Sequence, residues 1–181
     1  MRAKLALLGF FLLASQVRAE AEISEIKVNL DGDRVLTSFT LRDAFDRRLS
    51  ERVDSGLPTP ILYRLELDRD RRRWWDQKLK QNTLEVVAMY DAVARAYSVH
   101  YKLDGKLIES RTVRERKALE EAMTVIDQLP AFSLAGVSPD LRLVVKVAAE
   151  MGSRTILSFI PVTISTDWKE SARFHALPPP P

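Results

Sequence analysis

The chain has 181 residues, with 28 Lys and Arg against 25 Asp and Glu, and it contains no cysteine. The lack of cysteine excludes disulfides, thiolate metal ligands, a cysteine nucleophile and the lipidated cysteine of a bacterial lipoprotein. Residues 1–19 hold three positive side chains and no acid, so 28 minus 3 leaves 25 positive charges against 25 negative ones. This balance excludes the net positive field typical of a nucleic-acid-binding protein.

The N-terminus has the order of a secretory signal peptide. Arg2 and Lys4 precede an apolar run, residues 5–14, that is shorter than the about 20 residues of a membrane span. Ala19 ends a small-residue cleavage pattern, and Ala21 offers a second one. We therefore expect residues 1–19 to be a cleaved signal peptide, the folded part to be periplasmic, and no transmembrane segment to remain after cleavage.

The first part of the folded chain is predicted to form a hairpin and a helix. Residues 26–39 alternate apolar and polar side chains on both sides of Asp31-Gly32, which indicates a β-hairpin. Thr40 is then expected to cap a helix whose apolar side chains recur at helical spacing: Leu41, Ala44, Phe45, Leu49 and Val53. The helix is expected to end at a turn formed by Ser55, Gly56 and Pro58, since glycine favours the left-handed conformation and proline cannot continue a helix. A ligand-binding backbone nest at this turn is the alternative.

Antiparallel strands are predicted for the middle of the chain. Residues 61–67 alternate, as expected of a strand with one buried and one solvated face. Residues 84–89 and 97–103 follow as further strands, and Asp104-Gly105 predicts a second hairpin that returns through Leu107. The tyrosines of these strands are expected in the core, with the lining of an apolar cavity as the alternative: Tyr63, Tyr97 and Tyr101.

A second helix and further strands complete the predicted domain. Thr112 and Glu115 match a capping box, and a helical apolar stripe follows up to Pro130: Ala118, Leu119, Ala122, Val125, Ile126 and Leu129. Residues 141–149 alternate as a strand, and Pro161 predicts an edge or a kink within 156–165. We expect one domain over 22–174 and a disordered, proline-rich tail over 175–181. The predicted class is α+β, a mostly antiparallel sheet, sandwich or half-barrel like, with two principal helices.

Several short motifs occur in an order that resembles one family. Ser55-Gly56-Leu57-Pro58 is followed by the 63–67 strand, by an arginine-rich segment ending in Trp74-Trp75, and by Asp167-Trp168 with Ser171. From Phe45 to Phe174 the chain resembles the bacterial domain-of-unknown-function family number 4390. The resemblance implies a signal-bearing periplasmic protein, and it assigns no catalytic role to any residue.

The segment from 69 to 75 is the most unusual local feature of the sequence. Arginine pairs bidentately with phosphate and carboxylate, and tryptophan stacks on flat groups or lies at a membrane interface. We therefore place the candidate ligand or partner site on six side chains: Arg69, Arg71, Arg72, Arg73, Trp74 and Trp75. The alternative is a solvated strand end in which the tryptophans only pack.

Catalytic and metal chemistry find little support in the sequence. His100 is expected on the polar face of a strand, with Ser98 beside it, and no nucleophile elbow is present. The acid pairs are expected to be solvated surface: Asp31 with Asp33, Asp68 with Asp70, and Glu120 with Glu121. No metal-ligand spacing occurs, so neither a metal nor a cofactor is expected.

The sequence is compatible with three functions. The first is a non-enzymatic binding or adaptor module for an envelope protein. The second is a carrier or sensor of a hydrophobic, lipid or anionic envelope ligand, which requires an apolar cavity under the second helix. The third is an enzyme of unknown class, which requires acids or His100 to converge in a cleft. The sequence leaves the oligomeric state open.

Overall fold

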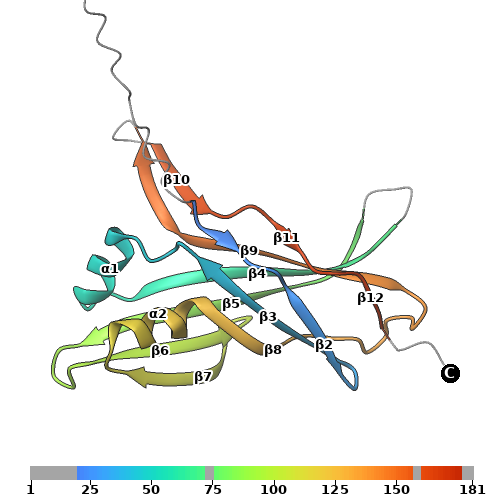
Figure 1. Cartoon of the computed structure of the whole chain (residues 1–181), viewed down its shortest axis with the longest axis horizontal. Coiled ribbons are helices and arrows are strands. Elements are labelled where there is room, and N and C mark those ends of the chain that lie inside the picture. The colour runs from blue at the N-terminus through green and yellow to red at the C-terminus, as the bar shows by residue number, and fades with distance from the viewer. Residues whose placement is uncertain (1–19, 72–75, 157–159, 177–181) are drawn as a thin grey trace, which may run out of the picture.

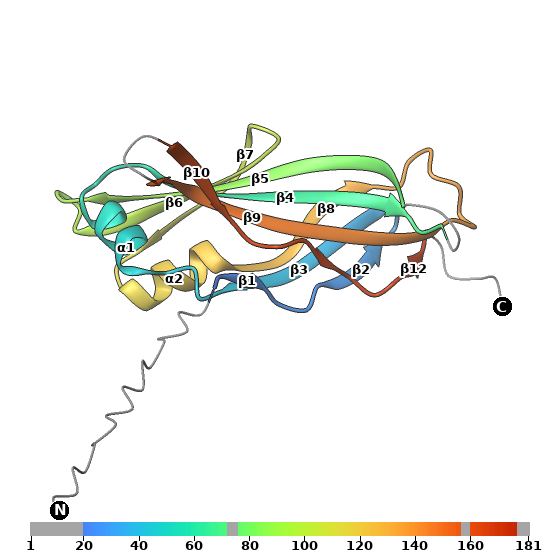
Figure 2. The same cartoon turned by 90° about the horizontal axis from the view of Figure 1, so that it is seen from above.

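A computed structural model of the chain describes residues 20–71, 76–156 and 160–176. Two antiparallel sheets pack face to face, and two helices lie at one end of the sandwich (Figure 1 and Figure 2). The fold is therefore α+β and dominated by antiparallel sheet, as predicted. The expected signal peptide lies outside the described residues.

The smaller sheet is built around β3 (Arg34–Arg42). β8 (Val125–Ser133) pairs with it, as do β1 (Glu22–Ile23) and β2 (Lys27–Asp31). The hairpin of β2 and β3 confirms the prediction for Asp31-Gly32, and Asp31 pairs with Arg34 across it. The alternation of β3 buries one face of the strand, which consists of Val35, Thr37, Phe39 and Leu41.

The larger sheet has the strand order β10-β9-β4-β5-β6-β7. The bounds of these strands are β10 (Ile160–Ser165), β9 (Arg142–Ile156), β4 (Thr59–Arg69), β5 (Gln77–Asp91), β6 (Ala96–Leu103) and β7 (Lys106–Val113). β11 (Lys169–Glu170) and β12 (Phe174–His175) also pair with β9. The strands predicted at 61–67, 84–89, 97–103 and 141–149 are confirmed. Each is longer than predicted, although β9 begins one residue later, at Arg142.

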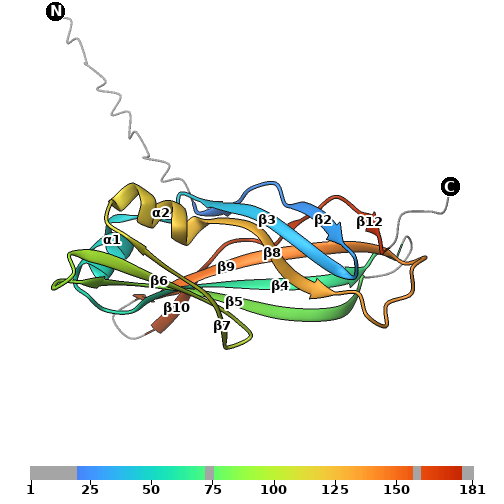
Figure 3. The ribbon, with the colours of Figure 1, turned by 90° about the horizontal axis from the view of Figure 1, so that it is seen from below.

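The core lies between the two sheets, which Figure 3 shows as separate layers. β4 contributes Ile61, Tyr63, Leu65 and Leu67, all fully buried. The Tyr63 ring meets the Phe39 ring of the opposite sheet edge to face, with 5.3 Å between centroids. Aromatic pairs in this geometry add stability beyond the area that they bury.

The first helix is shorter than predicted. α1 runs over Arg47–Asp54, and the Asp46 side chain caps it by accepting the Leu49 N–H at 2.9 Å. The prediction of a Thr40 cap is wrong, because Thr40 belongs to β3 and pairs with Val125 of β8. Sheet pairing along residues 40–42 replaces the local helical pattern.

The second helix begins later and ends earlier than predicted. α2 runs over Arg116–Thr124, so the predicted capping box at Thr112 is wrong: Thr112 lies in β7, and Glu115 caps the helix without a side-chain hydrogen bond. Val125 begins β8, and Pro130 lies within that strand instead of ending a helix. Gln128 has a positive φ of 49° at an irregularity in the pairing with β3. The extra residue lets Ile126 and Leu129 both face the core at a spacing that mimics a helix.

The packed chain reaches slightly further than predicted. His175 lies in β12 and Ala176 is buried, so both belong to the folded structure and not to the expected tail. Residues 177–181 lie outside the described part. Pro161 occurs in β10, at the edge of the larger sheet, as predicted. Among the described residues, no helix is long and apolar enough to cross a membrane.

Candidate functional site

A cluster of charged side chains holds the base of the loop that connects β4 to β5, and we call it the Lys146 cluster. The Lys146 ammonium group of β9 lies 3.2 Å from Asp68 Oδ2, 2.9 Å from Asp76 Oδ2 and 3.2 Å from Glu170 Oε1. One cation of β9 therefore contacts carboxylates from the end of β4, from the residue before β5 and from β11.

Asp70 extends this network toward the end of β9. Its carboxylate lies 3.0 Å from Arg142 Nε and 3.4 Å from Arg173 Nε, and its N–H donates to the Arg142 carbonyl at 2.8 Å. Arg173 also approaches Glu170, at 3.6 Å. Residues on both sides of the 69–75 segment are thus fixed to β9 and to the chain that follows β11.

Burial makes these charges depend strongly on each other. The Lys146 side chain is 18% exposed and the Asp68 side chain 6% exposed. Although burial opposes it, the hydrogen bonds that Lys146 donates to the three carboxylates hold the pKa of Lys146 above its usual range. The hydrogen bond from Lys146 holds the pKa of Asp76 below its usual range. Asp68 Oδ1 is buried and has no hydrogen-bond partner among the described residues, so this carboxylate depends on the contact that Oδ2 makes with Lys146.

The structure describes only part of the predicted arginine–tryptophan site. Arg69 ends β4 opposite Gln77, and the exposed Arg71 side chain donates to the Gln77 side-chain oxygen. Both arginines are therefore presented directly beyond the Lys146 cluster. Arg72, Arg73, Trp74 and Trp75 lie outside the described residues.

Core side chains of the larger sheet contact the C-terminal end of α2. The Tyr63 hydroxyl donates to the Met123 carbonyl at 2.7 Å, and the Tyr101 hydroxyl donates to the Ala122 carbonyl at 2.6 Å. Burial raises the pKa of both phenols, so they stay neutral donors. The two tyrosines join the sheet to the end of the helix, as expected of core residues.

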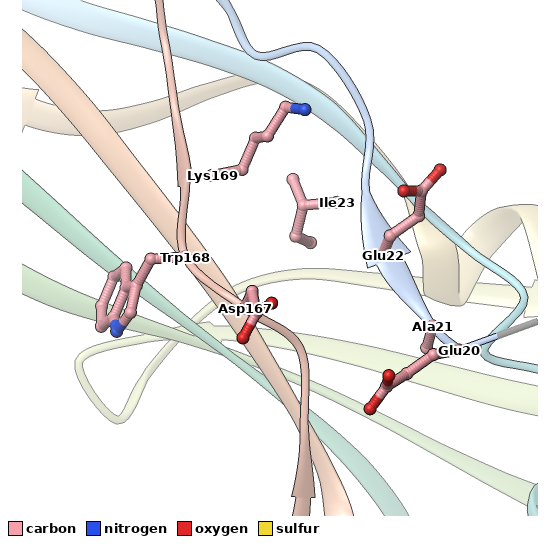
Figure 4. Close-up of a pocket in the computed structure, with 7 residues that line it drawn as sticks. All are labelled: Glu20, Ala21, Glu22, Ile23, Asp167, Trp168 and Lys169. Atoms are coloured by element: carbon pink, nitrogen blue, oxygen red, sulfur yellow. The ribbon is translucent and has the colours of Figure 1, made fainter.

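A shallow hollow of about 350 Å³ lies where the edges of the two sheets meet. Figure 4 shows Ile23 between β1 and the chain that leads into β11, with the Trp168 ring turned away from β1. The remaining lining is mostly charged: Glu20, Glu22, Asp167 and Lys169. This polar, open hollow differs from the enclosed apolar pocket of a typical lipid or small-molecule carrier.

The other predicted candidates lie apart from one another. His100 Nδ1 lies 2.9 Å from the Ser110 hydroxyl on the outer face of the larger sheet, and no converging acid is described there. Asp33 accepts a hydrogen bond from Ser133 at 2.8 Å beside its turn, and Glu120 and Glu121 are exposed on α2. Among the described residues, no group of acids or histidines has the arrangement of a metal site.

The turn at 55–58 has a structural explanation. Ser55 caps the C-terminus of α1, and Gly56 has a φ of +76°. A Cβ on Gly56 would lie 3.3 Å from the Tyr90 carbonyl oxygen. This position therefore requires glycine for both backbone conformation and close packing against β5, and Pro58 follows just before β4.

Comparison with known proteins identifies a family for this chain. No curated protein and no solved structure is significantly similar to the chain. A family model described as a domain of unknown function, DUF4390, matches residues 18–174. This match covers most of the sequence, so the chain belongs to the DUF4390 family.

Proposed function

We propose that this protein is an exported, non-enzymatic binding or adaptor module that recognises an anionic surface of another envelope protein. The segment Arg69–Trp75 makes the contact. The N-terminal signal pattern supports export. The Lys146 cluster supports the contact, because it fixes the base of the loop that connects β4 to β5.

The cluster supports this proposal through its charge balance. The carboxylates of Asp68, Asp70 and Asp76 are already paired with Lys146, Arg142 and Arg173. The exposed Arg69 and Arg71 beyond them therefore stay available to an external anion. Guanidinium groups that are held at a fixed base lose less entropy when they bind than groups on a free segment.

The packing beneath α2 favours an adaptor over a carrier. The carrier alternative requires an apolar cavity there, and this volume holds the buried side chains of Leu119 and Met123 together with the two tyrosine rings. A filled core with charged groups on the surface is typical of a module that binds through its exterior.

The first test identifies what the chain binds. The chain is expressed from its first residue in its own cells, cross-linked in place to retain weak partners, and purified from the periplasmic fraction for mass spectrometry. A stoichiometric protein partner supports the proposal. An added mass of lipid or metabolite size supports the carrier alternative and contradicts the proposal, as does recovery of the bare chain.

The second test assigns the contact to the arginines. Arg72→Ala with Arg73→Ala is expected to abolish partner capture and to leave the melting temperature nearly unchanged. Arg47→Ala with Arg48→Ala removes the same charge from exposed positions on α1, at the other end of the molecule (Figure 1). This matched control is expected to retain the partner. Equal capture by both variants contradicts the proposed contact.

A further inference from the structure

β7 forms an uncovered edge of the larger sheet. Within the described chain it pairs with β6 alone, and Figure 1 shows it along the outer side of the sheet. Residues 106–112 are all exposed, and the apolar Leu107 and Ile108 side chains are 56% and 44% exposed. The pairing with β6 is irregular at Ile108, so residues 109–113 form the regular part of this edge. An exposed edge of this kind readily pairs with another strand.

The free edge of β8 differs, because side chains of β5 cover it. Asn82 Nδ2 donates to the Ala131 carbonyl at 2.6 Å, and Lys80 Nζ donates to the Ser133 carbonyl at 2.5 Å. Pro130 supplies no N–H for pairing. The fold thus protects the edge of β8 and leaves β7 open.

The sequence of β7 is complementary to itself. When two copies are placed antiparallel with Ser110 opposite Ser110, Glu109 of each copy lies opposite Arg111 of the other. The irregularity at Ile108 ends the regular register beyond these residues. Opposite charges directly across from one another stabilise antiparallel neighbours. We propose that two copies of this chain associate through β7, with Ser110 on the two-fold axis, and so join their larger sheets into one. This association goes beyond the proposed function and uses a different surface.

Neighbouring registers are unfavourable. A two-fold axis perpendicular to the sheet places the same face of both strands on the same side of the joined sheet. The alternative registers therefore differ from this one by a shift of two residues. The next register in one direction places Glu109 opposite its own copy, and the next in the other direction places Arg111 opposite its own copy. Like charges directly opposite one another are destabilising. Charge therefore selects the register centred on Ser110.

The charged pair is already ordered within one chain. Arg111 Nε and Nη2 donate to the two Glu109 carboxylate oxygens at 2.6 and 3.1 Å, and the guanidinium carbon lies 4.8 Å from the centre of the Tyr101 ring. Pairing brings two such units together, so four charges of alternating sign surround the axis. A single strand pair is smaller than a standard interface of about 800 Å² per partner, and we expect a dimer that dissociates on dilution.

Charge exchange tests the pairing by sedimentation of the purified chain over a range of concentrations. Glu109→Arg alone and Arg111→Glu alone each create two like-charge pairs, and each is expected to weaken the dimer by at least about tenfold, which is 1.4 kcal/mol. Mixing the two variants restores opposite charges, and so does combining both substitutions in one chain; both are expected to recover the dimer. A monomeric wild type, or variants that dimerise equally, would overturn the proposal.

Cysteine cross-linking tests the register independently. The chain has no cysteine, so Ser110→Cys introduces a single thiol. Residues on the axis have Cα atoms about 4.5–5.5 Å apart, which is within disulfide range. Thr112→Cys is the matched control on the same face of the strand, because Thr112 and Ser110 pair with Ser98 and His100 of β6, and the two copies of residue 112 lie far from each other in this register. Disulfide dimers at 110 but not at 112 support the register, whereas equal cross-linking, or none at 110, contradicts it.

Discussion

Replacing Lys146 with methionine tests whether the Lys146 cluster holds the base of the loop that connects β4 to β5. Methionine preserves much of the side-chain length and removes the cation, which leaves Asp68 buried with no opposite charge in contact. Breaking a buried ion pair by removing one partner costs about 3–5 kcal/mol. The lower end, about 3 kcal/mol, applies here, because Lys146 is 18% exposed and water reaches Asp76 and Glu170.

The same reasoning fixes how this loss depends on pH. The pKa of Asp76 is lowered by Lys146, so its stabilising contribution is present above the ordinary carboxylate range and is lost as the pH falls through about 4 and below. The pKa of Lys146 is raised, so its contribution is present below about pH 10 and is lost as the pH rises further. The difference between wild type and Lys146→Met is therefore expected to be constant between about pH 5 and 9 and to shrink in acid.

Urea unfolding followed by circular dichroism measures both effects. The control is Asp68→Asn combined with Lys146→Met, which removes both charges and is expected to recover much of the lost stability. A loss below about 0.5 kcal/mol for Lys146→Met, the size of a surface effect, would refute the argument. So would a double variant no more stable than Lys146→Met.

Two further substitutions test a buried hydrogen bond at Ser171 and the backbone conformation and packing of Gly56. Ser171→Ala removes the hydroxyl that accepts the buried Val145 N–H at 3.0 Å, where the edge is interrupted between β11 and β12; we expect a loss of about 1–3 kcal/mol and faster hydrogen exchange at that amide. Gly56→Ala places a side chain at a φ of +76° and 3.3 Å from the Tyr90 carbonyl oxygen; we expect a loss of at least about 1–2 kcal/mol by thermal unfolding.

Each has a matched control within the chain. Ser165→Ala makes the same change at an exposed serine of β10 and is expected to be nearly neutral. Gly105→Ala occurs at a similar φ of +79° with nothing within 4 Å, so the difference from Gly56→Ala isolates the contact with β5. Equal effects of a variant and its control would contradict the structural explanation.

The strands and hairpins could be predicted because their determinants are local. Asp31-Gly32 and Asp104-Gly105 supply the turn conformations, and alternation along 61–67 marks one buried face. The helix boundaries could not be predicted in this way. Leu41 and the apolar side chains of residues 125–130 have spacings compatible with a helix. Sheet pairing decides the outcome, because residues 41–42 pair with β1 and residues 125–130 pair with residues 36–40 of β3.

The Lys146 cluster escaped prediction for a related reason. Alternation along 141–149 correctly places Lys146 on the face away from the core, where a lysine is ordinarily solvated. Its partners come from positions 68, 76 and 170, and only the pairing of β9 with both β4 and β11 brings them together. The sequence indicated the arginine-rich segment but not the base that holds it.

The self-complementarity of β7 lies entirely within eight residues, yet the sequence alone does not reveal its meaning. The pairing matters only because β7 is the last strand of its sheet and because side chains of β5 cover the competing edge of β8. Natural sheets protect open edges with charge or with bulges. In β7 the charges are placed so that they repel a copy in the wrong register and attract one in the right register. An edge protected only against aggregation has no need of that arrangement, and the exchange of Glu109 and Arg111 between two chains separates the two explanations.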